Sequence, residues 1–465
     1  MKLEISNIAT SDGWRGVLAD QVTGPLVREL ASKMVSYLGQ VDFIVGYDTR
    51  FMSDYFAALI TNTLIGLGCN CLLSHQPLAT PILAWSVKQK NEINNGRDCW
   101  GIQITASHNP AHYSGIKLRE PSGKAAGPRL LNRIMDASPS TLRGQPGTLE
   151  KADLITPYVD AMRQEFRDVK LPEPFTWIAV DAMHGASAGL CQAILTPENE
   201  VVALRQGHDP YFGGTPPEPK ENNLKPLRDK VEREKGCLVG IAHDGDGDRL
   251  AAWMPELGYL SPHDIGCLLA LNVLERGIPG ALVASATTTR RIGLLADHFG
   301  RSYFETDVGF HHAADIMLET PTAIAIEENG GIAFGHHLPD RDGTYSGLCL
   351  IRALTIHQGQ IDQMLTRIEA ITGPNHFERR DITTKSSQSG HLEQLKNSLP
   401  DLFGEDFSGS RDLLAGFKCT LADNNWLVVR RAGTEPLFRL YGETESKSKT
   451  AEILDKLESG LNSLL

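Results

Sequence analysis

The segment CLVGIAHDGDGDR (237–249) shows the pattern that decides the fold, an apolar run followed by a polar, glycine-rich loop. The run does not alternate strictly between polar and apolar residues, which is typical of a strand buried on both faces. Helical segments such as PLVRELASKMVSYL (25–38) fall between runs of this kind. This order predicts α/β domains with parallel or mixed sheets. The same pattern recurs in DFIVGYDTR (42–50), WGIQITASHNP (100–110), TWIAVDAMHGASAG (176–189), ALVASATTTRR (281–291), TAIAIEENGG (322–331) and WLVVRRAGTEP (426–436).

The chain length of 465 residues allows for several domains, since a domain usually has ~100–200 residues. A stretch rich in Pro, Gly and Ser (121–150) is expected to end the first domain. The segment PELGYLSP (255–262) is expected to separate a second domain from a third, and a polar stretch (384–412) lies near the start of a smaller last domain.

Composition excludes several classes of protein. The net charge of −12 argues against a nucleic-acid or anionic-membrane surface. The cysteines are scattered and include no C-x-x-C pair, which favours reduced thiols over disulfides or zinc sites. The N-terminal residues lack an apolar signal core, and apolar stretches such as 265–274 are too short to cross a bilayer. We expect a soluble cytoplasmic protein without an obligate protein partner.

The loop TASHNP (105–110) directly follows the apolar run WGIQI. Ser107, in a tight loop after a strand, is a candidate nucleophile if a neighbouring group activates it and another stabilises developing charge. Because Ser, His, Asn and Pro all favour turns, an ordinary turn explains the loop alone at least as well. His108 is a candidate catalytic residue on the same terms, and shaping the loop is its alternative role.

The loop DGDGDR (244–249) carries three carboxylates at alternate positions, Asp244, Asp246 and Asp248. Glycines between them let the backbone curl, and oxygen ligands suit a hard divalent cation such as Mg²⁺. An EF-hand would need Gly and Glu where Arg249 and Pro255 stand, so that alternative fails. A solvated acidic turn is disfavoured because the three charges would repel one another.

Two later loops are weaker signals by themselves. EENGG (327–331) offers carboxylate and amide groups to sugar hydroxyls, although a plain turn fits equally well. RRAGTEP (430–436) offers arginines, a hydroxyl and glycine amides to a phosphate dianion, and a basic surface turn is its alternative.

Taken in order, the four loops resemble those of the α-D-phosphohexomutase family, which includes phosphoglucomutases and phosphomannomutases. TASHNP resembles the family's phosphoserine loop, DGDGDR its metal loop, EENGG its sugar loop and RAGTEP its phosphate loop, and the resemblance covers the whole chain. Supporting matches are SDGWRG (11–16), GYDTR (46–50), ATPIL (79–83), GIK (115–117), DAMHG (181–185), TDVGF (306–310) and DRDG (340–343).

The resemblance implies an α/β fold with mixed sheets: three related α/β domains around a central cleft and a smaller C-terminal α+β domain. We place these domains at residues 1–150, 151–258, 259–378 and 379–465. They would carry the phosphoserine, metal, sugar and phosphate loops respectively.

The resemblance also implies the chemistry. Ser107 would be a phosphoserine, with one of its oxygens completing the Mg²⁺ shell begun by Asp244, Asp246 and Asp248. Its phosphoryl group would pass to the free hydroxyl of a hexose monophosphate and give a hexose 1,6-bisphosphate. That bisphosphate, also the expected activator, would reorient and return its other phosphate to Ser107.

Basic residues are needed at such a centre because a phosphoserine adds about −2 to three aspartates. Arg15, Lys117 and Arg249 are the candidates to offset the excess, and the family resemblance suggests acid–base roles for Arg15 and Lys117. An unperturbed lysine is protonated at pH 7, so Lys117 is the acid more readily than the base. The resemblance assigns the binding of the sugar's ring hydroxyls to Glu327 and Asn329. It assigns the binding of the non-reacting phosphate to Arg430, Gly433, Thr434 and Arg439.

Three residues depart from the family pattern. Asn329 and Ala432 each stand where the family usually has Ser, and His311 stands where many relatives have Lys. The expected reaction is the interconversion of hexose 1- and 6-phosphates, glucose first and mannose second. The alternatives are a phosphoglucosamine mutase, a phosphatase that uses the same serine, and a non-catalytic sugar-phosphate-binding relative.

Overall fold

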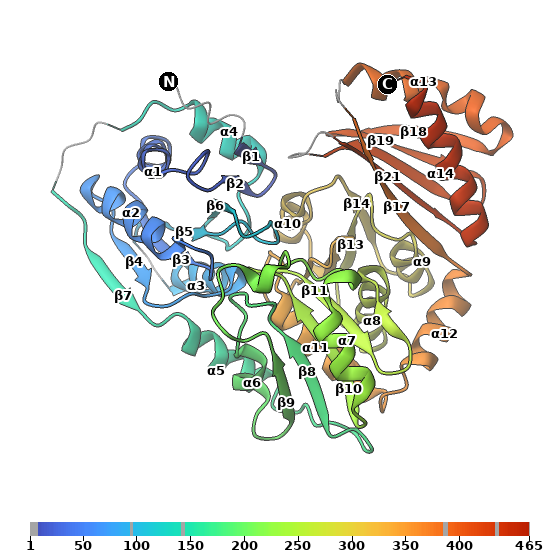
Figure 1. The fold of residues 1–465 in the computed structure, drawn as a ribbon, viewed down its shortest axis with the longest axis horizontal. Helices are drawn as coiled ribbons and strands as arrows, with labels where there is room; N and C mark the ends of the chain where they lie inside the picture. The colour runs from blue at the N-terminus through green and yellow to red at the C-terminus, as the bar shows by residue number, and fades with distance from the viewer. Residues whose placement is uncertain (1–7, 94–95, 141–144, 385–388, 433–436, 465) are drawn as a thin grey trace.

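The computed structural model describes residues 8–93, 96–140, 145–384, 389–432 and 437–464, which form four sheets with their helices (Figure 1). The N-terminal sheet has seven strands in the order β1-β2-β6-β5-β3-β4-β7 and is mixed. Its strands are β1 (Ala9–Thr10), β2 (Gly13–Val17), β3 (Asp42–Tyr47), β4 (Cys71–Ser74), β5 (Cys99–Ile104), β6 (Tyr113–Arg119) and β7 (Leu149–Ala152). Its helices are α1 (Gly24–Leu38), α2 (Ser53–Gly66), α3 (Thr80–Ile93) and α4 (Pro128–Asp136).

The second sheet is also mixed, with five strands in the order β12-β11-β10-β8-β9. Its elements are α5 (Ile155–Glu165), β8 (Trp177–Asp181), α6 (Leu190–Leu195), β9 (Glu200–Leu204), α7 (Lys225–Arg233), β10 (Cys237–His243), β11 (Leu250–Met254) and β12 (Gly258–Leu260). All seven residues of β10 are buried, as expected from the lack of polar alternation in CLVGIAH.

The third sheet has four strands in the order β14-β13-β15-β16, with β16 antiparallel to β15. Its elements are α8 (Pro262–Glu275), β13 (Ala281–Ser285), α9 (Arg291–His298), β14 (Tyr303–Thr306), α10 (Phe310–Glu319), β15 (Thr322–Ile326), β16 (Ile332–Phe334), α11 (Gly343–Ile356) and α12 (Ile361–Thr372). Apolar side chains from the first three sheets and their helices share one large core, to which Leu83, Val180 and Leu268 contribute.

The C-terminal sheet is antiparallel throughout, in the order β17-β21-β20-β19-β18. It lies at one end of the molecule in orange and red in Figure 1 and has a core of its own. Its elements are β17 (His376–Thr383), α13 (Ser389–Phe403), β18 (Phe407–Leu413), β19 (Gly416–Leu421), β20 (Trp426–Arg431), β21 (Leu437–Thr444) and α14 (Lys447–Asn462).

The predicted fold class is confirmed: three mixed α/β sheets are followed by a smaller α+β domain. The predicted domain ends at residues 150, 258 and 378 fall within β7, β12 and β17, and the exact division stays a prediction. Among the described residues, no helix combines the length and apolar character needed to span a membrane. All eight cysteines lie in the described ranges and are free and buried.

Candidate active site

Ser107 lies in the loop that follows β5, and its side chain is buried. Its φ of 54° is in the left-handed region, which a non-glycine residue adopts only when its surroundings hold it there. Ser107 Oγ donates a hydrogen bond of 2.9 Å to Asp244 Oδ2 and lies 3.3 Å from His108 Nδ1. The structure thus brings the predicted nucleophile and the predicted metal loop into direct contact.

Arg50 holds the serine loop by donating hydrogen bonds to the carbonyl oxygens of Ser107, Asn109, Pro110 and Tyr113, at 2.6, 2.7, 2.9 and 3.2 Å. Asp48 pairs with Arg50 at 3.1 Å and accepts a 2.6 Å hydrogen bond from Thr105 Oγ1. Asp48 and Arg50 both belong to the segment GYDTR, whose local pattern predicted no role for them. The available signal was a pair of opposite charges directly after a buried strand.

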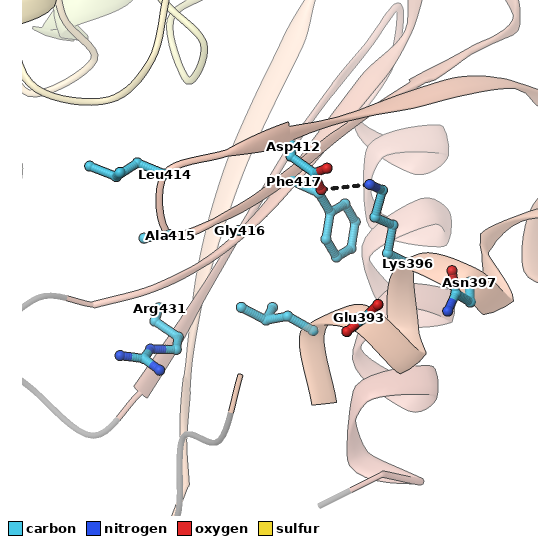
Figure 2. Close-up of a pocket in the computed structure, with 10 residues that line it drawn as sticks. Glu393, Lys396, Asn397, Asp412, Leu414, Ala415, Gly416, Phe417 and Arg431 are labelled. Carbon is cyan, nitrogen blue, oxygen red and sulfur yellow. Dashed lines mark hydrogen bonds and ion pairs between the residues drawn. The ribbon is translucent and has the colours of Figure 1, made fainter. Parts of the chain in front are cut away.

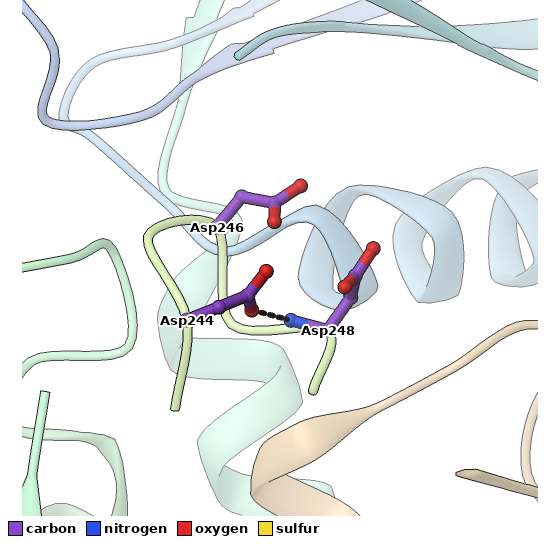
Figure 3. Close-up of side chains that lie close together, drawn as sticks. All are labelled: Asp244, Asp246 and Asp248. Carbon is purple, nitrogen blue, oxygen red and sulfur yellow. Dashed lines mark hydrogen bonds between the residues drawn. The ribbon is translucent and has the colours of Figure 1, made fainter. Parts of the chain in front are cut away.

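The metal loop connects β10 to β11, and Figure 3 shows its three aspartates side by side. Asp244 Oδ1 accepts hydrogen bonds from the backbone amides of Asp248 and Arg249, at 3.0 and 3.2 Å, so the loop folds around this carboxylate. One oxygen of each aspartate lies within 4.8 Å of one oxygen of the other two. The loop therefore gathers three buried oxygen ligands at one point.

These residues fit a hard divalent cation. Asp246 Oδ1 and Asp248 Oδ1 are buried and have no hydrogen-bond partner among the described residues. Burial, followed by the charges of Asp248 and Asp246, raises the pKa of Asp244 well above its ordinary value. A cation would supply the missing partner and relieve this repulsion, and carboxylate oxygens are the ligands that Mg²⁺ prefers.

Lys117, on β6, is fully buried against the same loop. Its Nζ lies 2.7 Å from Asp246 Oδ2, 2.7 Å from Asp248 Oδ2 and 3.1 Å from Asp12 Oδ2. Burial alone would lower the pKa of Lys117, but these three carboxylates outweigh it and raise the pKa. Lys117 is therefore a cation in the free protein.

The remaining predicted catalytic residues border this cluster. Arg249 Nε lies 3.9 Å from Asp244 Oδ2 and 4.0 Å from Asp248 Oδ1. Arg15 Nη1 donates a 3.3 Å hydrogen bond to Asn109 Oδ1, beside the serine. Burial and then the charge of Arg249 keep the pKa of His108 well below its usual value, so its ring is neutral.

The sugar loop lies against the metal loop, and a backbone hydrogen bond connects the two. The amide of Leu250 donates to the carbonyl of Gly330 at 3.0 Å. Glu327 is buried, and burial raises its pKa to about 7, opposed by Arg341. Asn329 Oδ1 accepts a 2.9 Å hydrogen bond from the Gly331 amide, so this oxygen shapes the loop.

The phosphate loop is described only in part, since Gly433 and Thr434 lie outside the described residues. Arg430 Nη2 is 2.9 Å from Tyr441 Oη and 3.9 Å from Glu328 Oε1, which places it beside the sugar loop. Arg439 faces Arg430 across the β20–β21 pair, so both arginines belong to one side of the sheet.

His311 lies at the start of α10, and its ring centroid is 4.0 Å from that of His312. Burial, with a smaller contribution from His312, lowers the pKa of His311 to about 4. The ring is therefore neutral at pH 7, whereas the lysine expected at this position from the family pattern would carry a positive charge.

Four charged residues of this cluster had no role in the sequence analysis: Asp12, Arg119, Asp340 and Arg341. Arg119 Nη1 lies 3.0 Å from Asp12 Oδ1, and Arg119 Nε lies 2.6 Å from Asp340 Oδ2. These residues belong to the motifs SDGWRG and DRDG or, for Arg119, to the end of the strand that contains GIK. The available signal was the presence of charges within otherwise apolar or glycine-rich segments.

A separate cavity of about 510 Å³ lies in the C-terminal domain, between α13 and the β18–β19 hairpin (Figure 2). Lys396 and Asp412 form an ion pair at its edge, and Arg431 also lines it. Arg430 is the next residue on β20 and so lies on the opposite face of the sheet. Among the described residues, none of those predicted for the active site lines this cavity.

Comparison with known proteins gives matches along most of the chain. Models of phosphoglucomutase/phosphomannomutase alpha/beta/alpha domains I, II and III match residues 7–142, 156–256 and 261–370. The phosphoglucomutase/phosphomannomutase of Thermococcus kodakarensis is 27% identical, over 95% of this chain and 96% of that protein. The probable phosphoglucosamine mutase of Methanothermobacter thermautotrophicus is 28% identical, over 97% of both chains. The crystal structure of a phosphomannomutase candidate from Thermus thermophilus has 26% identity and a TM-score of 0.83, and the match covers 98% of this chain and 99% of that one.

Proposed function

Since the chain belongs to the phosphoglucomutase/phosphomannomutase family and is a phosphohexomutase, we propose that it interconverts glucose 1-phosphate and glucose 6-phosphate through a phosphorylated Ser107. The observation that carries this proposal is the 2.9 Å hydrogen bond from Ser107 Oγ to Asp244 Oδ2, within a loop that gathers three buried carboxylates. A serine so placed has its oxygen next to carboxylates that can hold the divalent cation that phosphoryl transfer requires.

Asp244, Asp246 and Asp248 would hold Mg²⁺, which when bound neutralises part of the phosphoryl charge. The cluster around the serine holds six buried or nearly buried carboxylates and five cations, a formal net charge of −1 when every group is ionised and no ligand is bound. They are Asp12, Asp244, Asp246, Asp248, Glu327 and Asp340 against Arg15, Lys117, Arg119, Arg249 and Arg341. A phosphoserine adds about −2 and Mg²⁺ adds +2, so the charge of the site stays the same.

Lys117 and His108 have opposite proton states around Ser107. Lys117 keeps its proton because its pKa is raised by three carboxylates, and its proposed role is to donate to the oxygen that leaves phosphorus. The neutral His108 ring, 3.3 Å from Ser107 Oγ, has a nitrogen that can accept the serine proton when the hydroxyl attacks a phosphoryl group. Arg249 and Arg15 would stabilise the transferring group.

Sugar and phosphate recognition would come from the third and fourth domains. Glu327 and Asn329 would bind ring hydroxyls that both substrate orientations present. The non-reacting phosphate would lie against the phosphate loop, whose proposed ligands are Arg430, Gly433, Thr434 and Arg439. In this arrangement one site serves both half-reactions, with hexose 1,6-bisphosphate as the intermediate and as the activator that restores phosphoserine.

Glucosamine 1-phosphate is the second candidate substrate, because a relative with this named activity has 28% identity over nearly the full chain. The test is to incubate purified protein with Mg²⁺ and a trace of glucose 1,6-bisphosphate, and to compare glucose, mannose and glucosamine 1-phosphates. We expect glucose 1-phosphate to be converted fastest. Faster turnover of glucosamine 1-phosphate would refute the substrate, and wild-type activity in Ser107→Ala would refute the nucleophile.

A further inference from the structure

Arg341 lies in the segment between β16 and α11, and its side chain is buried. It crosses directly over Gly331 of the sugar loop, where a Cβ would lie 2.4 Å from Arg341 Cδ. The missing side chain at position 331 thus makes room for the arginine. Its guanidinium also lies over the Phe310 ring, 5.5 Å from the centroid, so packing as well as charge fixes it.

The guanidinium of Arg341 reaches carboxylates from three separate loops. Nη2 lies 2.7 Å from Asp12 Oδ2 and 3.2 Å from Asp248 Oδ2. Nη1 lies 3.5 Å from Glu327 Oε2. These acids come from the first, second and third sheets, so a single side chain connects three domains at the site. Arginine suits this position because its nitrogens form a rigid fork.

Lys117 shares two of these carboxylates with Arg341. Asp12 Oδ2 and Asp248 Oδ2 each lie near both cations, so the two acids and the two bases alternate. Each cation also contacts one carboxylate that the other does not: Lys117 Nζ lies near Asp246, whereas Arg341 Nη1 lies near Glu327. Lys117 therefore serves the metal loop, and Arg341 connects that loop to the sugar loop.

We propose that Arg341 is a positioning residue for the transfer reaction, whose fork fixes Glu327 relative to the metal loop and whose charge offsets Asp12 and Asp248. The inference rests on the proposed function, in which Glu327 binds sugar hydroxyls. Through Arg341, the place of the sugar is set with respect to the phosphoryl group on Ser107.

The two parts of this role can be separated by substitution. Arg341→Lys keeps a cation between Asp12 and Asp248, but its single nitrogen cannot also hold Glu327. Arg341→Met removes both the fork and the charge. Arg352→Met is a matched control, because Arg352 is a buried arginine of the same domain that pairs with Asp168, away from the site.

The experiment measures KM and kcat for glucose 1-phosphate, and Mg²⁺ affinity of the unphosphorylated protein by calorimetry. We expect Arg341→Lys to raise KM about tenfold, the usual effect of losing a supporting contact, with Mg²⁺ affinity within about twofold of the wild type. Arg341→Met should raise KM at least as much and bind Mg²⁺ about fivefold more tightly, because a nearby positive charge is lost. Arg352→Met should leave all three quantities within about twofold.

A disrupted fold would weaken Mg²⁺ binding, so tighter binding in Arg341→Met separates the proposed role from general damage. An unchanged KM in Arg341→Lys, or weaker Mg²⁺ binding in a folded Arg341→Met protein, would overturn the inference. If Arg341→Met does not fold, as judged by circular dichroism, the KM of Arg341→Lys decides. Absence of turnover in the wild type would instead refute the proposed substrate, while the Mg²⁺ titrations still test the charge of Arg341.

Discussion

Replacing Arg50 by methionine removes the group that holds the Ser107 loop. The substitution leaves Asp48 buried without its cation, and breaking a buried ion pair in this way costs about 3–5 kcal/mol. Four backbone carbonyls also lose their donor, among them that of Ser107. Because the left-handed backbone of Ser107 is unfavourable by roughly 1–2 kcal/mol, we expect the loop to relax and move the hydroxyl away from Asp244.

The expected outcome is a loss of about 3–5 kcal/mol in the unfolding free energy at pH 7 and a fall in kcat of at least about 10²-fold. Burial already raises the pKa of Asp48, with Arg50 opposing, so removing Arg50 raises it further. Asp48 then protonates more readily as pH falls, and the loss of stability should be smaller at pH 5 than at pH 7. Denaturant unfolding at both pH values and turnover of glucose 1-phosphate measure these effects.

The double variant Asp48→Asn/Arg50→Met is the matched control. It no longer has an unpaired charge at position 48, but it still lacks the clamp, that is, the hydrogen bonds from Arg50 to the serine loop. It should recover about half of the lost stability and little of the lost activity. Wild-type turnover in Arg50→Met, or a double variant no more stable than the single one, would refute the account of the clamp.

Two further predictions concern the site itself. Because burial raises the pKa of Glu327 from 4.5 to about 7, the folded protein between these pH values binds a proton that the unfolded chain has released. The free energy of unfolding should therefore fall by up to about 3 kcal/mol as pH rises from 4.5 to 7. Glu327→Gln should lack this fall in denaturant titrations, and equal pH profiles for the variant and the wild type would contradict the assignment. Thr80 Oγ1 donates a 2.6 Å hydrogen bond to Asp246 Oδ2, so Thr80→Val should raise the Mg²⁺ concentration for half-maximal activity about tenfold; a metal titration that matches the wild type would show that this hydrogen bond does not support the ligand.

Much of the fold follows from short segments. CLVGIAH and WGIQI are mainly apolar, without alternation of polar residues, because their strands are buried on both faces, and the loops after them carry the three aspartates and Ser107 respectively. The antiparallel pairing of the strand WLVVRR with its neighbours could not be predicted from its own sequence. An apolar run of this kind fits a buried strand of either direction, and the partners of β20 are decided by tertiary packing.

In the candidate site, too, the residues of local motifs could be predicted from the sequence, whereas contacts between distant segments could not. Ser107 and Asp244 could be identified because each lies in a distinctive local motif. The connection between Asp12 and Arg341 could not, since 329 residues separate them and each motif alone is a plain charged turn. Arg50 and Thr80 were likewise overlooked, because their partners lie in loops 57 and 166 residues away.

The crossing of Arg341 over Gly331 has a consequence for evolution and design. A side chain larger than hydrogen at position 331 overlaps the stem of the arginine, so the two positions cannot drift independently. A lineage that exchanged Arg341 for a short residue would free position 331 to vary, but it would lose the bridge between Glu327 and Asp248 at the same step. We therefore expect substrate preference in this scaffold to be altered more readily at Asn329, by a residue whose oxygen still accepts from the Gly331 amide, than at the glycine two residues later.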